Sequence, residues 1–100
     1  MKIYTDEEAF LIASMDRVLS VVQDAFNFNN RPEELPLLIQ EVKAVCDKMD
    51  IKKQRDELLE YVQICKDELE LQRLFDVTPP SYIRFRIGGV LMNLKKTQEK

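Results

Sequence analysis

The chain of 100 residues contains only two glycines, which are adjacent at Gly88 and Gly89, and four prolines. Folds with many turns need such residues at short intervals, so long stretches without Gly or Pro favour helices. Apolar residues make up 45% of the chain and charged residues 33%, which is typical of a folded protein and not of a disordered one. We therefore predict a single all-α domain over residues 1–100, a small antiparallel bundle of three to four helices.

The first helix is predicted over residues 6–26. Thr5 is followed three residues later by Glu8, the spacing of a capping box. Apolar residues then recur at helical spacing and mark one buried face, which comprises Leu11, Ile12, Met15, Val18, Leu19, Val22, Ala25 and Phe26. Phe10 and Val21 widen this face, so we expect the helix to contact more than one neighbour.

Two further helices are predicted over residues 33–49 and 51–75. The apolar positions shift by about two residues near 49–53, which is roughly 200° around a helix. A break there would let both apolar faces turn toward one core, and we favour it. The alternative is one continuous helix over 33–75. Pro79 and Pro80 end the third helix, because neither has the N–H that a helix interior requires.

Residues 82–95 are compatible with two structures. In a β-hairpin, Gly88 and Gly89 would form a two-residue turn and the apolar side chains would share one face. In a helix, Thr78 would be the N-cap, and the apolar stripe would be Ile83, Ile87, Val90, Leu91 and Leu94. Two glycines inside a helix cost about 2 kcal/mol relative to alanine, but they would let another helix approach closely. We favour the helix because everything before it is helical.

Positive charge gathers toward the C-terminus. The net charge is −3, yet residues 77–100 hold five basic residues and one Glu. In the helical alternative, several bulky side chains here lie opposite the main apolar stripe. Tyr and Arg are frequent anchors of protein interfaces. We therefore predict a partner-binding surface made of Tyr82, Arg84, Phe85, Arg86 and Met92.

The predicted function is that of a non-enzymatic protein–protein interaction module, such as an adaptor, a chaperone-like subunit or a regulator. Its partner would be another protein or a second copy of the chain. The alternative is a small RNA-associated scaffold, in which the aromatic rings of the same surface stack on bases and its arginines bind phosphates. Nucleic acid is the less favoured partner, because an acidic chain lacks a broad basic face.

The sequence gives little indication of catalysis or of metal and cofactor binding. There is no histidine, which removes the commonest general base and most zinc sites, and we predict no catalytic, cofactor-binding or metal-binding residues. The acidic groups Glu57, Glu60 and Asp67 are expected to be solvated. The two cysteines, Cys46 and Cys65, are expected to be reduced, as in a cytoplasmic protein. We expect no signal peptide and no membrane-spanning segment, since no apolar run approaches about 20 residues.

One segment is similar to a known family. Ser81-Tyr82-Ile83-Arg84-Phe85-Arg86-Ile87, followed by Val90-Leu91-Met92-Asn93-Leu94, resembles a late helix of MIF4G-type helical-repeat domains, where a similar Ile-Arg-Phe run precedes an apolar stretch. The similarity covers about fourteen residues. Gly88 and Gly89 depart from it, and the chain is about half the length of such a domain. The resemblance implies stacked helix pairs and a scaffold role in translation or mRNA metabolism.

Overall fold

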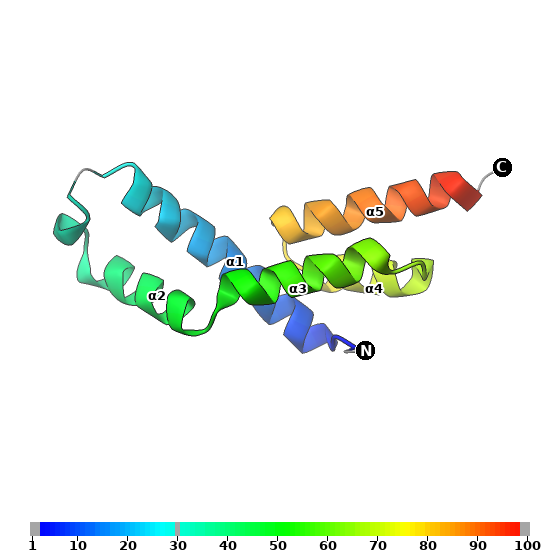
Figure 1. Ribbon diagram of the computed structural model, residues 1–100, viewed down its shortest axis with the longest axis horizontal. Helices are drawn as coiled ribbons and strands as arrows, with labels where there is room; N and C mark the ends of the chain where they lie inside the picture. The colour runs from blue at the N-terminus through cyan, green and yellow to red at the C-terminus, as the bar shows by residue number, and fades with distance from the viewer. Residues whose placement is uncertain (1–2, 30, 99–100) are drawn as a thin grey trace.

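The computed structural model describes residues 3–29 and 31–98. These ranges form five α-helices and one short 3-10 helix, Pro32–Glu34, and contain no strand. The α-helices are α1 (Asp6–Asn27), α2 (Leu37–Lys48), α3 (Ile51–Ile64), α4 (Glu68–Val77) and α5 (Tyr82–Gln98) (Figure 1). The predicted all-α bundle is confirmed, with one helix more than expected. The alternative with a C-terminal β-hairpin at residues 82–95 is wrong, because α5 runs straight through both glycines.

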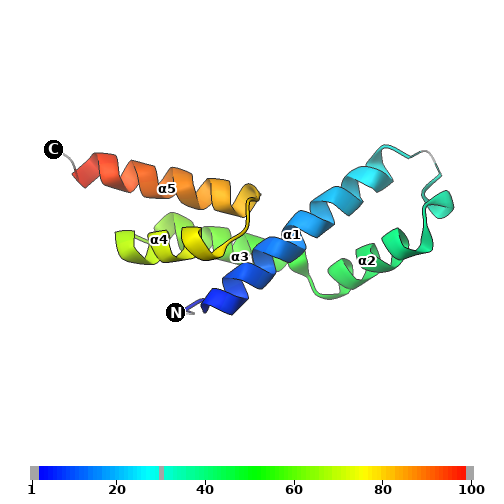
Figure 2. The ribbon, with the colours of Figure 1, turned by 180° about the vertical axis from the view of Figure 1, so that it is seen from behind.

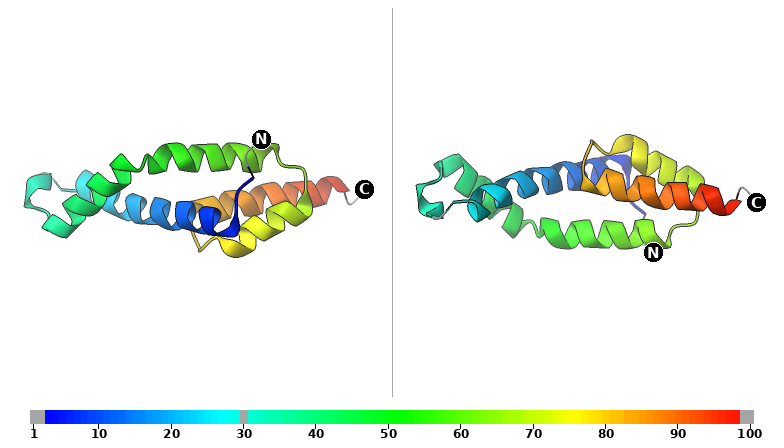
Figure 3. Two further views of the ribbon diagram at one scale, coloured as in Figure 1. Left: turned by 90° about the horizontal axis from the view of Figure 1, so that it is seen from below. Right: turned by 90° about the horizontal axis from the view of Figure 1, so that it is seen from above.

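The molecule is elongated, with principal extents of 56 × 24 × 18 Å. Helices α3, α4 and α5 lie together at one end, while α1 crosses α3 and continues to the other end, where it pairs with α2 (Figures 1 and 3). Helix α1 therefore joins the two ends of the molecule. The prediction that α1 contacts more than one neighbour is confirmed, because it packs against all four other helices. The predicted buried face of α1 is only partly correct: Ile12, Leu19 and Val22 are buried, whereas Leu11 and Val18 are exposed, because the neighbouring helices cover a narrower part of α1 than the apolar stripe.

The apolar core is divided between these two ends. The larger cluster lies where α3, α4 and α5 meet the first half of α1, and its buried members are Tyr4, Ala9, Ile12, Ala13, Leu58, Val62, Leu71, Leu74, Ile83, Ile87 and Leu91. The smaller cluster lies under α2 and contains Leu19, Cys46 and Ile51. The prediction that the apolar faces of residues 33–49 and 51–75 share one core is therefore wrong, because α2 and most of α3 serve different clusters.

Local sequence explains where α1 and α2 begin. The hydroxyl of Thr5 accepts a hydrogen bond from the Glu8 amide at 3.1 Å, and the Glu8 carboxylate accepts one from the Thr5 amide at 3.4 Å, so the predicted capping box is present. Helix α2 begins at Leu37 and not near residue 33, because the 3-10 helix and Pro36 precede it.

The predicted break between the second and third helices is confirmed at Met49 and Asp50. Asp50 adopts a left-handed backbone conformation with φ 54°, which Asp tolerates better than most residues. This single residue interrupts the helix and offsets α3 from α2, while both helices continue toward the end of the molecule that holds α4 and α5 (Figure 1). It explains how a helix break forms where the sequence offers neither glycine nor proline.

The predicted continuous helix over residues 51–75 is wrong. The chain leaves the helix after Ile64 and starts α4 at Glu68. The Asp67 carboxylate is the N-cap of α4, since its Oδ1 accepts hydrogen bonds from the amides of Leu69 at 3.0 Å and Glu70 at 3.4 Å. The Asp67-x-x-Glu70 spacing was the sequence signal for this start.

Candidate functional site

Helix α5 has one buried face and one exposed face. The hydroxyl of Ser81 accepts a hydrogen bond from the Arg84 amide at 3.2 Å, which makes Ser81 the cap of α5. The predicted cap, Thr78, is instead buried, and its hydroxyl donates to the Phe75 carbonyl. Ile83 and Ile87 are fully buried in the larger cluster. On the opposite face the side chains of Phe85 and Met92 are 75% and 62% exposed.

An open groove runs along the exposed face of α5 beside the end of α4. It has a volume of about 630 Å³ and is lined by Phe75, Pro80, Ser81, Arg84, Phe85, Gly88, Gly89 and Met92. We call this the α5 groove. Most of its lining is apolar, and Arg84 is its one charged side chain. Such a surface suits an apolar helix or loop of a partner that also carries a few polar groups.

The two glycines explain the shape of the α5 groove. A Cβ added at Gly88 would lie 3.2 Å from Cε2 of Phe75, so the absence of a side chain there lets α4 pack closely against α5. A Cβ at Gly89 would meet nothing within 4 Å, because that position opens into the groove. The expectation that the glycines allow another helix to approach is confirmed for Gly88.

Arg84 is held in the α5 groove by an aromatic ring. Its guanidinium carbon lies 4.4 Å from the centroid of the Phe75 ring, in the range of a cation–π interaction. Its Nε is buried and has no hydrogen-bond partner within the described residues. A buried N–H without an acceptor costs free energy.

The remaining cations of α5 lie outside the groove. The Nη1 of Arg86 donates a hydrogen bond to the Tyr82 hydroxyl of the same helix at 3.0 Å. Lys95 and Lys96 are exposed in the last turns. In residues 3–29 and 31–98, none of these cations or Arg84 forms a salt bridge with a carboxylate. The helix thus presents four positive charges to solvent and to any ligand.

The five predicted site residues are only partly brought together. Arg84, Phe85 and Met92 line the α5 groove, whereas Tyr82 and Arg86 pair with each other beside it. Sequence reasoning missed Phe75, which forms the aromatic wall. The one signal available was the pair of glycines, because a helix position without a side chain leaves room that a neighbouring ring can fill.

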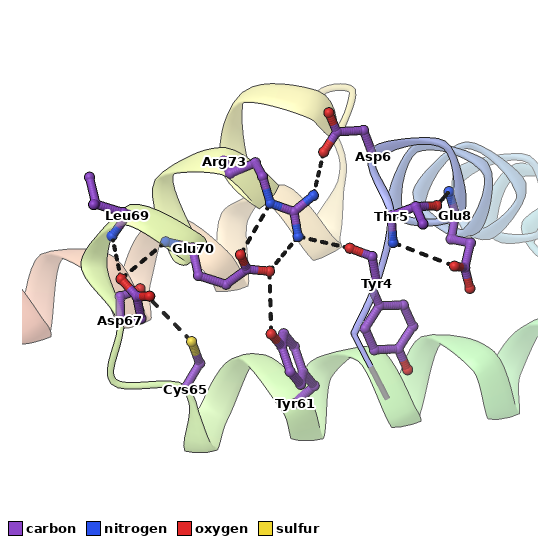
Figure 4. Close-up of polar contacts among 10 residues, drawn as sticks. All are labelled: Tyr4, Thr5, Asp6, Glu8, Tyr61, Cys65, Asp67, Leu69, Glu70 and Arg73. Carbon is purple, nitrogen blue, oxygen red and sulfur yellow. Dashed lines mark hydrogen bonds and ion pairs between the residues drawn. The ribbon is translucent and has the colours of Figure 1, made fainter. Parts of the chain in front are cut away.

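A separate polar cluster fastens the start of the chain to α4 and α3 (Figure 4). The Arg73 guanidinium donates to the Tyr4 carbonyl at 2.8 Å and also contacts the carboxylates of Asp6 and Glu70. The Tyr61 hydroxyl donates to Glu70 at 3.3 Å. The hydrogen bond and charge of Glu70 raise the pKa of Arg73 further above its ordinary value, so its charge is permanent. This cluster holds three segments together and is structural.

Among the described residues, one carboxylate that the sequence did not single out is buried. Asp16 of α1 is only 5% exposed, and its Oδ1 lies 3.4 Å from Nη1 of Arg55 on α3. Burial raises the pKa of Asp16, while the charge and hydrogen bond of Arg55 act in the opposite direction. Among the predicted solvated groups, Glu57, Glu60 and Asp67 are indeed exposed.

The residues described by the structure contain no group of three or more His, Cys, Asp or Glu side chains arranged to hold a metal ion. No helix in those ranges has the length and apolar character needed to cross a membrane. Both cysteines are free, with Cys46 buried under α2.

Comparison with known proteins identifies no relative. No family model matches the chain, and neither the curated proteins nor the solved structures contain a match. The resemblance of residues 81–94 to MIF4G-type domains therefore gains no support from these comparisons.

Proposed function

We propose that this protein is a non-enzymatic binding module, and that its α5 groove takes an apolar helical segment of another protein. The observation that carries the proposal is the exposure of Phe85 and Met92 beside a groove walled by Phe75. Large exposed apolar side chains grouped around a hollow are unfavourable in water and are typical of interaction sites.

The positive charge of α5 indicates what kind of partner helix would bind there. Helix α5 carries Arg84, Arg86, Lys95 and Lys96 and no acidic residue. The best-matched partner is therefore an amphipathic helix whose apolar face fills the groove and whose polar edge carries Asp or Glu. Such a module would act as an adaptor, chaperone-like subunit or regulator, and its free cysteines fit a cytoplasmic location.

A display library of amphipathic helical peptides tests this proposal. The protein should select peptides with one apolar face and flanking carboxylates. Replacing Phe85 or Met92 by Ala should lower the affinity for the selected peptides by about tenfold. The same changes should alter the free energy of unfolding by no more than about 0.5 kcal/mol. The matched control is Leu69→Ala on α4, an exposed apolar residue outside the groove, which should change neither quantity.

Two results would contradict the proposal. One is a set of selected peptides that bind Phe85→Ala and Met92→Ala as tightly as the unaltered protein. The other is a large loss of thermal stability in these variants, which would place both side chains in a structural role.

The second candidate is an RNA-associated module, favoured by the presence of Tyr82, Phe85 and two arginines on one helix. The salt dependence of the binding affinity distinguishes the two functions. Fluorescence anisotropy with a single-stranded oligoribonucleotide should show an affinity that falls steeply with salt if phosphates are bound. Binding of an apolar helix should change much less, and we favour the protein partner because the groove lining is mainly apolar.

A further inference from the structure

Helix α1 carries a second apolar face, distinct from the face that packs into the core. Its members are spaced alternately by three and four residues, the pattern of a coiled-coil interface. We call this set the α1 seam, and it consists of Leu11, Ser14, Val18, Val21 and Ala25 of α1 together with Phe28, the residue that caps its C-terminal end. The set spans most of the helix, so the face is a continuous strip and not an isolated patch.

The larger side chains of the α1 seam are uncovered in the single chain, while Ser14 and Ala25 are half-buried. Val21 and Phe28 are 66% and 88% exposed, and Leu11 and Val18 are also exposed. The residues of α1 that are buried, such as Ile12, Asp16 and Leu19, lie on other sides of the helix. From behind, α1 runs diagonally in front of α3 and no other helix passes in front of it (Figure 2). A strip of this length is accessible to another helix.

The middle of the α1 seam forms the floor of an open groove of about 420 Å³. Ser14, Arg17, Val18, Val21 and Val22 line it from α1, and Pro79 of the α4–α5 connection lines it from the side. The apolar strip extends beyond the groove, to Leu11 in one direction and Phe28 in the other. The occupant that matches both the groove and its extensions is therefore a helix as long as the seam.

We propose that this occupant is α1 of a second copy of the chain, packed antiparallel about a two-fold axis. The midpoint of the seam lies between Val18 and Val21, so a two-fold rotation superimposes the seam on itself. Small side chains then face small ones and large side chains face large ones, because the layers are Val18 with Val21, Ser14 with Ala25, and Leu11 with Phe28 of the second copy.

Charge complementarity selects this arrangement. Arg17 and Asp24 flank the seam on one side, both are exposed, and neither forms a salt bridge with any described residue. Arg17 precedes Val18 by one residue and Asp24 follows Val21 by three, so in the antiparallel pair each Arg17 lies beside Asp24 of the second copy. A parallel, in-register pair would place Arg17 beside the apolar Val22. The dimer contact is independent of the α5 groove.

Light scattering across a concentration series tests the dimer. The unaltered protein should have twice the mass of one chain, and Val21→Glu should convert it to a monomer that keeps its helical circular dichroism. The control Leu69→Glu introduces the same change at an exposed apolar position of α4 and should remain dimeric. A monomeric unaltered protein, or a dimer that tolerates Val21→Glu, would overturn the proposal.

A charge exchange tests the antiparallel register. Arg17→Asp replaces two attractions by two repulsions and should raise the dimer dissociation constant by about tenfold. Adding Asp24→Arg to that variant restores opposite charges across the interface and should return the constant to within about threefold of its original value. Lys53→Glu, an exposed charge reversal on α3, should leave it unchanged. Failure of the double variant to recover would rule out this arrangement.

Discussion

Asp16 combines burial with an ion pair, and the balance between the two determines how it responds to pH. Its carboxylate lies beside Arg55, with Asp56 also near, while Lys52 and Asp24 line the same small hollow. Burial is the largest influence and raises the pKa of Asp16. The folded state therefore favours the protonated acid, and the contribution of Asp16 to stability is greatest at low pH. This contribution is lost as the pH rises through the raised pKa.

Substitution of Asp16 by Asn should expose this dependence. Asn resembles the protonated acid but does not titrate, so the stability of the variant relative to the unaltered protein should increase between about pH 4 and pH 7. Urea unfolding at a series of pH values measures this difference. Glu57→Gln, at an exposed carboxylate on α3, is the control and should show no such trend. A difference that shrinks with rising pH would mean that the Arg55 ion pair outweighs burial.

At the scale of a helix, the two glycines of α5 offer a direct comparison. Gly89→Ala should stabilise the protein by about 1 kcal/mol, since it removes the helix cost of glycine and the new methyl meets nothing within 4 Å. Gly88→Ala should stabilise less or destabilise, because the methyl would lie 3.2 Å from the Phe75 ring. Thermal or urea unfolding of both variants measures this. Equal gains would show that α4 and α5 are not in close contact at Gly88.

The helices were predictable from sequence where capping and periodicity agreed. The start of α1 follows from Thr5 and Glu8. The apolar pattern of residues 82–95 also fitted a hairpin, and the helix was favoured there because everything before it is helical. The start of α4 was missed because the apolar positions continue in phase through residue 69, so that only the cap at Asp67 marks the break. Periodicity describes which side of a helix is apolar, but it does not say whether the helix is continuous.

The α5 groove and the α1 seam show a second limit of prediction from sequence. The side of α5 that carries Phe85 and Met92 followed from helical spacing, but the wall formed by Phe75 depends on how α4 packs against α5. Similarly, the wide apolar face of α1 predicted several neighbours. Which part of that face stays uncovered depends on where α2, α3 and α4 end, and this is a property of the tertiary arrangement.

At the scale of the whole molecule, the two ends differ in how many apolar side chains they bury. The larger cluster draws buried side chains from four helices, whereas the smaller one contains only Leu19, Cys46 and Ile51 among the described buried residues. Helix α2 contributes a single buried residue, Cys46, and leaves Leu37, Leu38 and Val45 exposed. Regions with few buried apolar contacts open more readily than the rest of a protein.

Amide hydrogen exchange should therefore be faster in α2 than in α3, α4 or the first half of α5. Cys46→Ala removes the one buried side chain of α2 and should accelerate exchange in α2 while leaving α4 nearly unchanged, because only local opening is affected. Leu74→Ala, in the larger cluster, should instead accelerate exchange throughout by lowering global stability by about 2 to 5 kcal/mol. Protection of α2 equal to that of α4 would mean that the exposed face of α2 is covered in solution.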